Sequence, residues 1–199
     1  MATTVGGEMA PANVNQLVRQ AKAGNSQAVA ALYQQYATAI YRYIYYRVPT
    51  SSDAEDLTAE VFLKMVEGLP KYNITGAPFE AWLYRIAAAR VADFHRRAHQ
   101  RPQDELSEHL ADYVPLPEEQ LQETQEAEVL RQMLRQFSEE DQNILILRFV
   151  ERKSHKDVAS ILGKTVSAVK SAQHRALVQL ADRMGAEGKI RHYLRGGDE

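Results

Sequence analysis

Apolar residues recur every three or four positions along most of this sequence, and glycines and prolines fall between the periodic stretches. This spacing is typical of amphipathic α-helices that bury one face. Successive short segments that alternate apolar and polar residues, which would indicate β-strands, are absent from the sequence. We therefore expect an all-α fold. The clearest apolar stripe contains Leu32, Tyr36, Ile40, Tyr43 and Ile44.

The first half of the chain predicts four helices that pack into one domain, residues 12–100. Asn25 can cap the second helix, and residues 52–55 (Ser-Asp-Ala-Glu) have the spacing of a capping box that opens the third. Pro78 suits the first turn of the fourth helix. The third helix is expected to bury Leu57, Val61, Met65 and Val66. The four helices are expected over residues 13–22, 25–48, 52–68 and 79–99.

Residues 101–126 contain three prolines, many acids and little periodicity, which predicts a flexible acidic linker between two helical domains. No proline follows Pro117. The second domain is expected over residues 127–184, and a tail (185–199) follows it. Residues 1–11 are expected to form a flexible N-terminus before the first domain. Its helices are expected at residues 127–136, 139–151, 155–162 and 166–183.

Several function classes are excluded by what the chain lacks. It has no cysteine, which rules out disulfides, thiolate metal sites and cysteine nucleophiles. No apolar run reaches the roughly 20 residues of a membrane helix, and no secretory signal opens the chain, so we expect a cytoplasmic protein without membrane insertion. His95 and His99 are one helical turn apart but lack a third ligand. We expect no catalysis, no metal and no cofactor.

The net charge of −2 hides three blocks of opposite sign. Residues 81–101 carry a net charge of +4, residues 103–141 carry −10, and residues 142–184 carry +5. Two basic blocks flanking an acidic one indicate an anionic partner that is contacted at two places.

Residues 154–180 have the pattern of a helix-turn-helix. A capping box at Ser154 and Asp157 opens one short helix, Gly163 allows the tight turn, and Thr165 can cap the second helix. A plainer interpretation is a pair of packed amphipathic helices with solvated charges, but the net charge and the placement of Gly163 favour the DNA-binding motif. The second helix would expose short hydroxyls beside cations, which suits a major-groove reader. These residues are Ser167, Lys170, Ser171, His174 and Arg175.

Residues 78–101 interleave arginines with aromatic residues, a mixture that suits single-stranded nucleic acid because bases stack on the rings while phosphates pair with the cations. The aromatic residues are Trp82, Tyr84 and Phe94. The alternative is structural: Trp82 is more often a core residue, and the arginines near the end of the helix could complement its dipole.

Three motifs in this order resemble the extracytoplasmic-function (group 4) sigma factors of the sigma-70 family. The first is DAEDLTAEVF at residues 53–62. The second combines Phe79, WLYRIA at residues 82–87 and the Asp93, Arg96, Arg97 group, and the third is the helix-turn-helix. Ala59, Ala89 and Asp157 depart from the Gln, Asn and Glu that are usual in this family.

The resemblance implies a protein that binds core RNA polymerase, through its clamp coiled coil and flap, and directs it to promoters. It implies that Asp53, Glu55, Asp56, Leu57, Glu60 and Phe62 bind the polymerase. The melted −10 strand would be contacted by Lys71, Tyr72, Asn73, Trp82, Arg85, Arg90, Asp93, Arg96 and Arg97, with the loop at residues 71–77 accepting a flipped base. The −35 duplex would be contacted by Lys164, Thr165, Ser167, Lys170, Ser171, His174 and Arg175.

An anti-sigma factor is a further partner that the resemblance implies. The competing hypothesis is a stand-alone helix-turn-helix regulator, in which the first domain binds a ligand or a second copy and only the second domain contacts DNA. A regulator would have no need of the acidic helix at residues 53–62 or of the arginines at 85–101, and co-purification with core polymerase would separate the two hypotheses.

Overall fold

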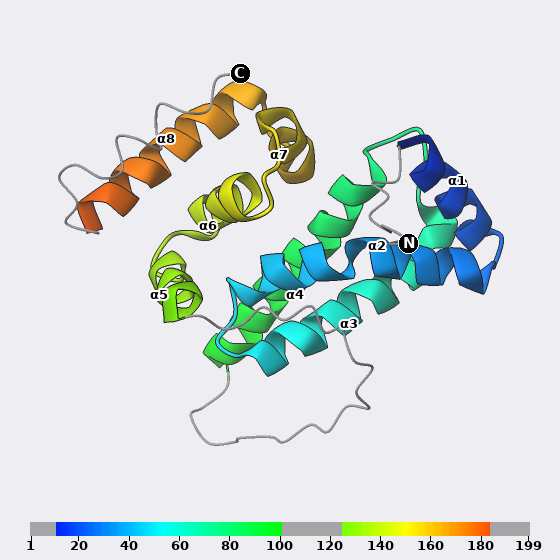
Figure 1. Cartoon of the computed structure of the whole chain (residues 1–199), viewed down its shortest axis with the longest axis horizontal. Coiled ribbons are helices and arrows are strands. Elements are labelled where there is room, and N and C mark those ends of the chain that lie inside the picture. The colour runs from blue at the N-terminus through cyan, green and yellow to red at the C-terminus, as the bar shows by residue number, and fades with distance from the viewer. Residues whose placement is uncertain (1–10, 101–124, 184–199) are drawn as a thin grey trace, which may run out of the picture.

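A computed structural model describes residues 11–100 and 125–183, and within these ranges the chain is helical with no β-strand. The all-α prediction is confirmed (Figure 1). Most of the predicted linker, the N-terminus and the tail lie outside the described residues. The elements in chain order are α1 (Pro11–Lys22), α2 (Ser26–Tyr45), α3 (Ser51–Gly68), the 3-10 turn η1 (Leu69–Lys71), α4 (Phe79–Gln100), α5 (Gln125–Leu134), α6 (Glu139–Leu145), the π-helical turn η2 (Ile146–Val150), α7 (His155–Leu162) and α8 (Val166–Arg183).

Helices α1–α4 form the N-terminal unit, in which α2 packs against each of the other three helices. Asn25 caps α2 as predicted, because its side-chain oxygen accepts a hydrogen bond from the Ala28 N–H at 3.1 Å. The apolar stripe of α2 is buried, and Val61, Met65 and Leu83 from α3 and α4 pack against it.

The start of α3 differs from the prediction. The capping box is formed by Thr50 and Asp53 instead of residues 52 and 55: the Asp53 N–H donates to Thr50 Oγ1 at 3.0 Å, and the Thr50 N–H donates to Asp53 Oδ2 at 3.1 Å. An N-cap residue needs an extended backbone, and Thr50 has it (φ −125°, ψ 160°), whereas Ser52 already lies inside the helix. The prediction that Val66 is buried was also wrong, because helical geometry turns it about 100° away from Met65.

Helices α5–α8 form the C-terminal unit, and its α7–turn–α8 segment is the predicted helix-turn-helix. Ser154 and Asp157 form the expected capping box, and Gly163 adopts the left-handed conformation (φ +65°). Thr165 Oγ1 accepts a hydrogen bond from the Ala168 N–H at 3.1 Å. Val169 on α8 is fully buried. These contacts confirm the helix-turn-helix that the local pattern predicted.

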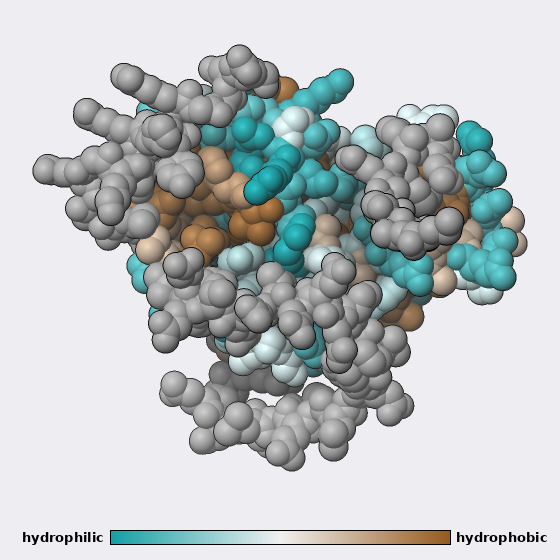
Figure 2. Space-filling model, viewed as in Figure 1, coloured by the Kyte–Doolittle hydropathy of each residue, from teal (hydrophilic) through white to brown (hydrophobic). Residues whose placement is uncertain are grey.

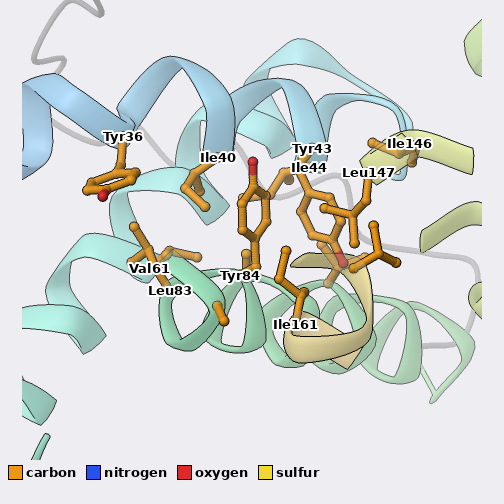
Figure 3. Close-up of a cluster of buried hydrophobic side chains, with 14 of the residues drawn as sticks. Tyr36, Ile40, Tyr43, Ile44, Val61, Leu83, Tyr84, Ile146, Leu147 and Ile161 are labelled. Atoms are coloured by element: carbon orange, nitrogen blue, oxygen red, sulfur yellow. The ribbon is translucent and has the colours of Figure 1, made fainter. Parts of the chain in front are cut away.

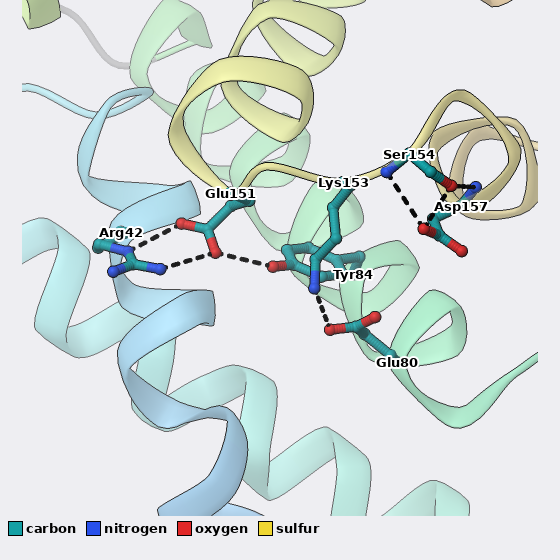
Figure 4. A network of polar contacts seen from close by, with 7 residues as sticks. All are labelled: Arg42, Glu80, Tyr84, Glu151, Lys153, Ser154 and Asp157. Atoms are coloured by element: carbon teal, nitrogen blue, oxygen red, sulfur yellow. Dashed lines mark hydrogen bonds and ion pairs between the residues drawn. The ribbon is translucent and has the colours of Figure 1, made fainter. Parts of the chain in front are cut away.

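The single helix predicted at residues 139–151 is interrupted. After α6 the backbone widens into η2, and the Glu151 N–H donates to Ile146 O, five residues back, at 2.9 Å. Arg152 then adopts φ +51°, a left-handed conformation that is uncommon outside glycine. The chain therefore reverses sharply between η2 and α7, and Glu151 points toward the N-terminal unit (Figure 4).

The two units share one continuous hydrophobic core. Leu147 of η2 and Ile161 of α7 pack beside Tyr43 of α2 and Tyr84 of α4 (Figure 3), and all four are buried. The sequence predicted two domains, and the structure adds that they are packed against each other along α4 and α7.

Replacing Gly163 by alanine is expected to lower the free energy of unfolding by about 1 kcal/mol, because an L side chain is strained at this φ. No atom lies within 4 Å of the position that a Cβ would take, so the effect would come from the backbone alone. Thermal unfolding followed by circular dichroism would measure it. Gly163→Asn is the matched control, since asparagine tolerates this conformation. Equal stability of the alanine variant and the wild type would contradict the assigned turn geometry.

Candidate nucleic-acid interface

All seven residues predicted to contact duplex DNA are exposed on α8 and on the turn before it. Their spacing along α8 places five of them on one face, while Val169, Ala172 and Ala176 on the opposite face are fully buried. The exposed face thus combines hydroxyls, an imidazole and two long cations: Ser167, Lys170, Ser171, His174 and Arg175. Such a set can donate to phosphates and to the edges of bases.

The cations of this face differ in their surroundings. Lys164 Nζ forms an exposed ion pair with Glu140 Oε1 at 3.1 Å, which is weak in solvent. Within the described part of the chain, Lys170 and Arg175 form no ion pair. Arg148 Nε donates to Gln173 Oε1 at 2.9 Å, a bond that joins η2 to α8. The two unpaired cations are therefore available to an anionic partner.

The loop between η1 and α4 is held in place by its own hydrogen bonds. The Tyr72 hydroxyl donates to Ala77 O at 2.7 Å, and Lys22 Nζ on α1 donates to Tyr72 O at 2.6 Å. Asn73 Oδ1 accepts hydrogen bonds from both the N–H and the hydroxyl of Thr75. Lys71 and Asn73 are exposed, whereas Tyr72 is buried. The loop offers an ordered polar rim above a buried aromatic ring.

Tyr72, Phe79 and Trp82 form an aromatic cluster at the base of this loop. The ring centroids of Tyr72 and Trp82 are 4.7 Å apart, and Phe79 lies 5.7 Å from Tyr72 and 5.6 Å from Trp82. Gly68 makes room for the indole, because a Cβ at that position would lie 2.9 Å from Trp82 Cζ2. Tyr72, which was predicted to contact the −10 strand, is buried in the structure, whereas Trp82 is half-buried.

The arginines of α4 fall into two groups. In the C-terminal half of α4, Asp93 forms ion pairs with Arg90 (2.5 Å) and with Arg96. The side chains of Arg96 and Arg97 are exposed. Arg85 instead donates to two backbone carbonyls at the end of α7: its Nη2 to Ser160 O at 2.6 Å and its Nε to Ile161 O at 3.1 Å. Arg85 is therefore occupied by the C-terminal unit.

Tyr84 is a core residue and not a stacking platform for bases, because its side chain is fully buried between the two units. The pKa of its hydroxyl is raised well above the usual value, mainly by burial and further by the charge of Glu151. The hydroxyl is therefore protonated at any physiological pH and acts as a hydrogen-bond donor.

The acidic helix α3 exposes part of the residue set predicted to bind polymerase. Asp56 is exposed, and Glu55 and Glu60 are half-buried. Leu57 and Phe62 are buried in the core, so they cannot contact a partner directly, and Asp53 is bonded to Thr50 in the capping box. Helical geometry leaves two apolar side chains on the outward face instead: Leu63 is 59% exposed and Val66 is 44% exposed.

Metal chemistry receives no support within the described residues, where no group of three His, Cys, Asp or Glu side chains is placed to hold an ion. His95 Nε2 lies 2.8 Å from Arg47 O, which is a structural contact. The side chain of His99 lies outside the described residues. Among the described helices, none is both long and apolar enough to span a bilayer.

Comparison with known proteins identifies the family. Two family profiles match the chain: "Sigma-70 region 2" over residues 32–101 and "Sigma-70, region 4" over residues 127–180. The chain is also 35% identical to the ECF RNA polymerase sigma factor SigD of Mycobacterium tuberculosis over 179 residues, which cover 86% of this chain and 84% of SigD. The chain belongs to the ECF sigma factors.

A second relative of this ECF sigma factor is BldN of Streptomyces coelicolor, at 36% identity over 172 residues. That match covers 85% of this chain but 65% of BldN, so the chain spans just under two thirds of BldN's length. Two solved structures share the fold. CnrH, solved with the cytosolic domain of CnrY, has a TM-score of 0.68 at 21% identity over 87% of this chain and 98% of that chain. RpoE from Bartonella quintana, solved with the anti-sigma factor NepR, has a TM-score of 0.58 at 19% identity over 79% and 97%.

The sequence prediction for this ECF sigma factor missed Leu63 and Val66. The signal was present: both residues share a helical face with Asp56, seven positions before Leu63, and that face is opposite the Val61–Met65 stripe. It was overlooked because Val66 was assigned to the core. The face combines acids with exposed aliphatic side chains, a composition that can bind a partner through a hydrophobic centre with a charged rim.

Proposed function

We propose that this ECF sigma factor binds core RNA polymerase and directs it to promoters, where the C-terminal unit reads the −35 duplex and the N-terminal unit contacts the melted −10 strand. The observation that carries the proposal is the exposed face of α8 in the helix-turn-helix, which we call the recognition face. Its hydroxyls and cations are all exposed, and its residues are Ser167, Lys170, Ser171, His174 and Arg175. The family assignment supports it. The protein has no catalysis and no cofactor of its own in this proposal, and it acts in the cytoplasm, where the polymerase is.

The −35 contact is assigned to the start of α8 and the turn before it. In helix-turn-helix proteins the N-terminal residues of the recognition helix reach base edges in the major groove. Ser167 and Ser171 are short enough for close approach, and Arg175 can donate two hydrogen bonds to a guanine. Lys164 and Lys170 supply phosphate contacts, which position the helix without specifying a base.

The −10 contact is assigned to the rim of the 71–77 loop and to the C-terminal half of α4. Lys71 and Asn73 are exposed on the loop, and Arg96 and Arg97 are exposed on the helix. Single-stranded DNA binds through phosphate pairing and base stacking, and Trp82 and Phe94 are the half-buried aromatic side chains of α4. Asp93 holds two of the arginines on one side of the helix.

Polymerase docking is assigned to the outward face of α3, on which Leu63 and Val66 form the hydrophobic centre and Asp56 and Glu60 the acidic rim. An acidic rim suits basic residues on the polymerase clamp coiled coil. The polymerase flap would contact the C-terminal unit. Exposed apolar side chains there include Phe149 and Val178, and hydrophobic residues gather over the area of α6 and α8 on the face shown in Figure 2.

An anti-sigma factor is proposed as a further partner. RpoE of Bartonella quintana was solved with such a factor, NepR, and CnrH was solved with the cytosolic domain of CnrY. Those structures are similar to this chain in fold, and the exposed apolar side chains of both units provide area for a protein partner.

Run-off transcription with core polymerase on a library of promoter fragments tests the proposed function. The expected result is a set of transcripts that require the added protein and share a −35 and a −10 sequence. In a separate pull-down, the protein is expected to co-purify with core polymerase. Duplex DNA binding without co-purification or transcription would support the stand-alone regulator instead and would contradict the proposal.

A further inference from the structure

We propose that Lys22 on α1 is a positioning residue for the 71–77 loop, and that it fixes the orientation in which Asn73 and the turn after it contact the −10 strand. The role of the loop in reading the −10 strand rests on the proposed function, whereas the anchoring of the loop rests on the contacts described below. The matching region 2 profile begins at residue 32, so Lys22 lies before the part of the chain that this profile covers.

The anchor is a hydrogen bond between the last turn of α1 and the backbone of the loop. Lys22 Nζ donates to Tyr72 O at 2.6 Å, and the two residues are 50 positions apart in the sequence. Lys22 is half-buried, and in the described part of the chain no carboxylate pairs with it. A hydrogen bond from a charged donor is stronger than one between neutral groups, so it can hold a backbone carbonyl in one direction.

The carbonyl of Tyr72 can accept this bond because of its place in the chain. Tyr72 directly follows the 3-10 turn η1, and its own N–H donates back to Gly68 O and to Leu69 O, both at 3.1 Å. Its backbone is extended (φ −65°, ψ 131°), so the helical hydrogen bonds of η1 do not continue past it. Carbonyl groups at the end of a helical segment have no partner within that segment. Lys22 on α1, which packs against η1 (Figure 1), supplies the missing partner.

The rim of the loop follows the direction of this peptide group. Rotation of the peptide between Tyr72 and Asn73 would redirect Asn73, which is exposed. It would also redirect the turn that begins there, in which the Gly76 N–H donates to Asn73 O at 3.1 Å. The Asn73 side chain moves with the turn, because its Oδ1 accepts hydrogen bonds from the Thr75 N–H at 3.1 Å and from the Thr75 hydroxyl at 2.9 Å. Residues 73–76 are therefore oriented as one group through Tyr72 O.

The aromatic cluster holds the ring of Tyr72, which is a separate contact. The ring packs against Phe79 and Trp82, and its hydroxyl donates to Ala77 O at 2.7 Å. These contacts set the place of the loop, but they leave the Tyr72 carbonyl able to turn, because ψ is a soft backbone dihedral. Loss of the Lys22 donor should therefore loosen the rim of the loop and leave the helical fold intact.

Arg19 provides a way to separate this role from two simpler ones. A cation in the last turn of a helix is favourable whatever it contacts, and α1 carries two of them, Arg19 and Lys22. A lysine near the loop could also pair directly with a phosphate. Arg19 is exposed, and in the described part of the chain it forms no hydrogen bond with the loop. Arg19→Met is therefore the matched control, since it removes the same charge from the same turn.

Amide hydrogen exchange in the full-length chain tests the anchor without DNA or polymerase. Lys22→Met keeps a long apolar stem and removes the donor. The expected result is exchange of the Thr75 and Gly76 amides that is faster by about fivefold or more, because these amides open when the rim loosens. Arg19→Met should leave their exchange unchanged, and Lys22→Arg, which keeps a charged donor, should restore most of the protection. Unchanged exchange in Lys22→Met would overturn the anchor.

Run-off transcription with core polymerase tests the link to the −10 strand. The templates are a promoter that the run-off experiment has identified and a set of its variants, each with one base of the −10 element or of the −35 element replaced. The preference for the original −10 base over the replaced one should fall by about three- to tenfold in Lys22→Met, because a loop with several orientations contacts both bases alike. The −35 preference should stay unchanged.

Two outcomes would overturn this link. One is faster amide exchange in Lys22→Met with an unchanged −10 preference. The other is an equal loss on every template together with a weaker dependence on salt, which would make Lys22 a phosphate contact. If circular dichroism shows that Lys22→Met loses helical content, Lys22→Gln provides the answer, because its amide is one bond shorter and cannot span the same contact. Failure of the proposed function would be seen separately, as no transcription with the wild-type chain while Lys22→Met still shows faster loop exchange.

Discussion

Replacing Leu63 by aspartate is expected to weaken binding to core RNA polymerase by about 30-fold or more. Leu63 is the most exposed of the large apolar residues in the described part of the chain, and it lies at the centre of the outward face of α3. Truncating a central hydrophobic anchor of an interface costs about 2 kcal/mol or more. An added charge would also have to be buried without a partner. Fluorescence titration of the labelled chain with core polymerase would measure the loss.

Because the side chain of Leu63 is in solvent, Leu63→Asp should leave the thermal unfolding of the free chain nearly unchanged. Ala30→Asp is the matched control: it adds the same charge at an exposed position of α2 in the same unit. The assignment of this face would be wrong if Leu63→Asp and Ala30→Asp bound polymerase equally well. Phe62→Ala is a poorer test, because Phe62 is buried and its loss would destabilise the fold by about 3–5 kcal/mol.

Replacing Arg175 by alanine is expected to lower transcription from a promoter that the run-off experiment has identified. The expected loss corresponds to about 1–3 kcal/mol of binding free energy. Arg175 is exposed on the recognition face of α8, and its planar guanidinium can donate to two acceptors of one guanine. The loss should be confined to one base pair of the −35 element. On a promoter substituted at that base pair, the variant and the wild-type protein should give equal transcription.

Lys170→Ala provides the contrast, because a phosphate contact positions without specifying. It should weaken every promoter to a similar extent and reduce the slope of log affinity against log salt by about 0.9. Arg135→Ala removes the same charge as Arg175→Ala at an exposed position outside α8 and serves as the control. If Arg175→Ala weakened all promoters equally, Arg175 would be a phosphate contact and not a base reader.

The helix-turn-helix was predictable because every signal in it is local. Ser154 and Asp157 cap α7 from within one turn, Gly163 takes the left-handed conformation that ends it, and Thr165 caps α8. Caps and turns act over three or four residues, so their chemistry is visible in the sequence. The exposed face of α8 followed from the same periodicity.

The proposed docking face of α3 was only partly predictable. The acids and the helix were recognised, but the capping box was placed two residues too late and Val66 was assigned to the core. Hydrophobicity alone does not tell which of two adjacent apolar residues is buried, because that depends on the direction from which α2 and α4 approach. The helical face that Leu63 and Val66 share with Asp56 is visible in the sequence, and the structure shows that the opposite stripe, with Val61 and Met65, is the one that fills the core.

Local sequence chemistry accounts for the helices, their ends and the basic face of α8. The docking of the two units has a different origin. Arg42 and Glu151 are 109 residues apart, and Arg85 and Ser160 are 75 apart. No local pattern therefore distinguishes these pairs from the many other possible pairs of hydrogen-bond donors and acceptors in the chain. Their contact depends on how η2 turns Glu151 toward α2 and α4, and on the shared apolar core that excludes water around it. Glu151, whose burial no local pattern predicts, is buried in the folded chain and accepts hydrogen bonds from Arg42 and Tyr84.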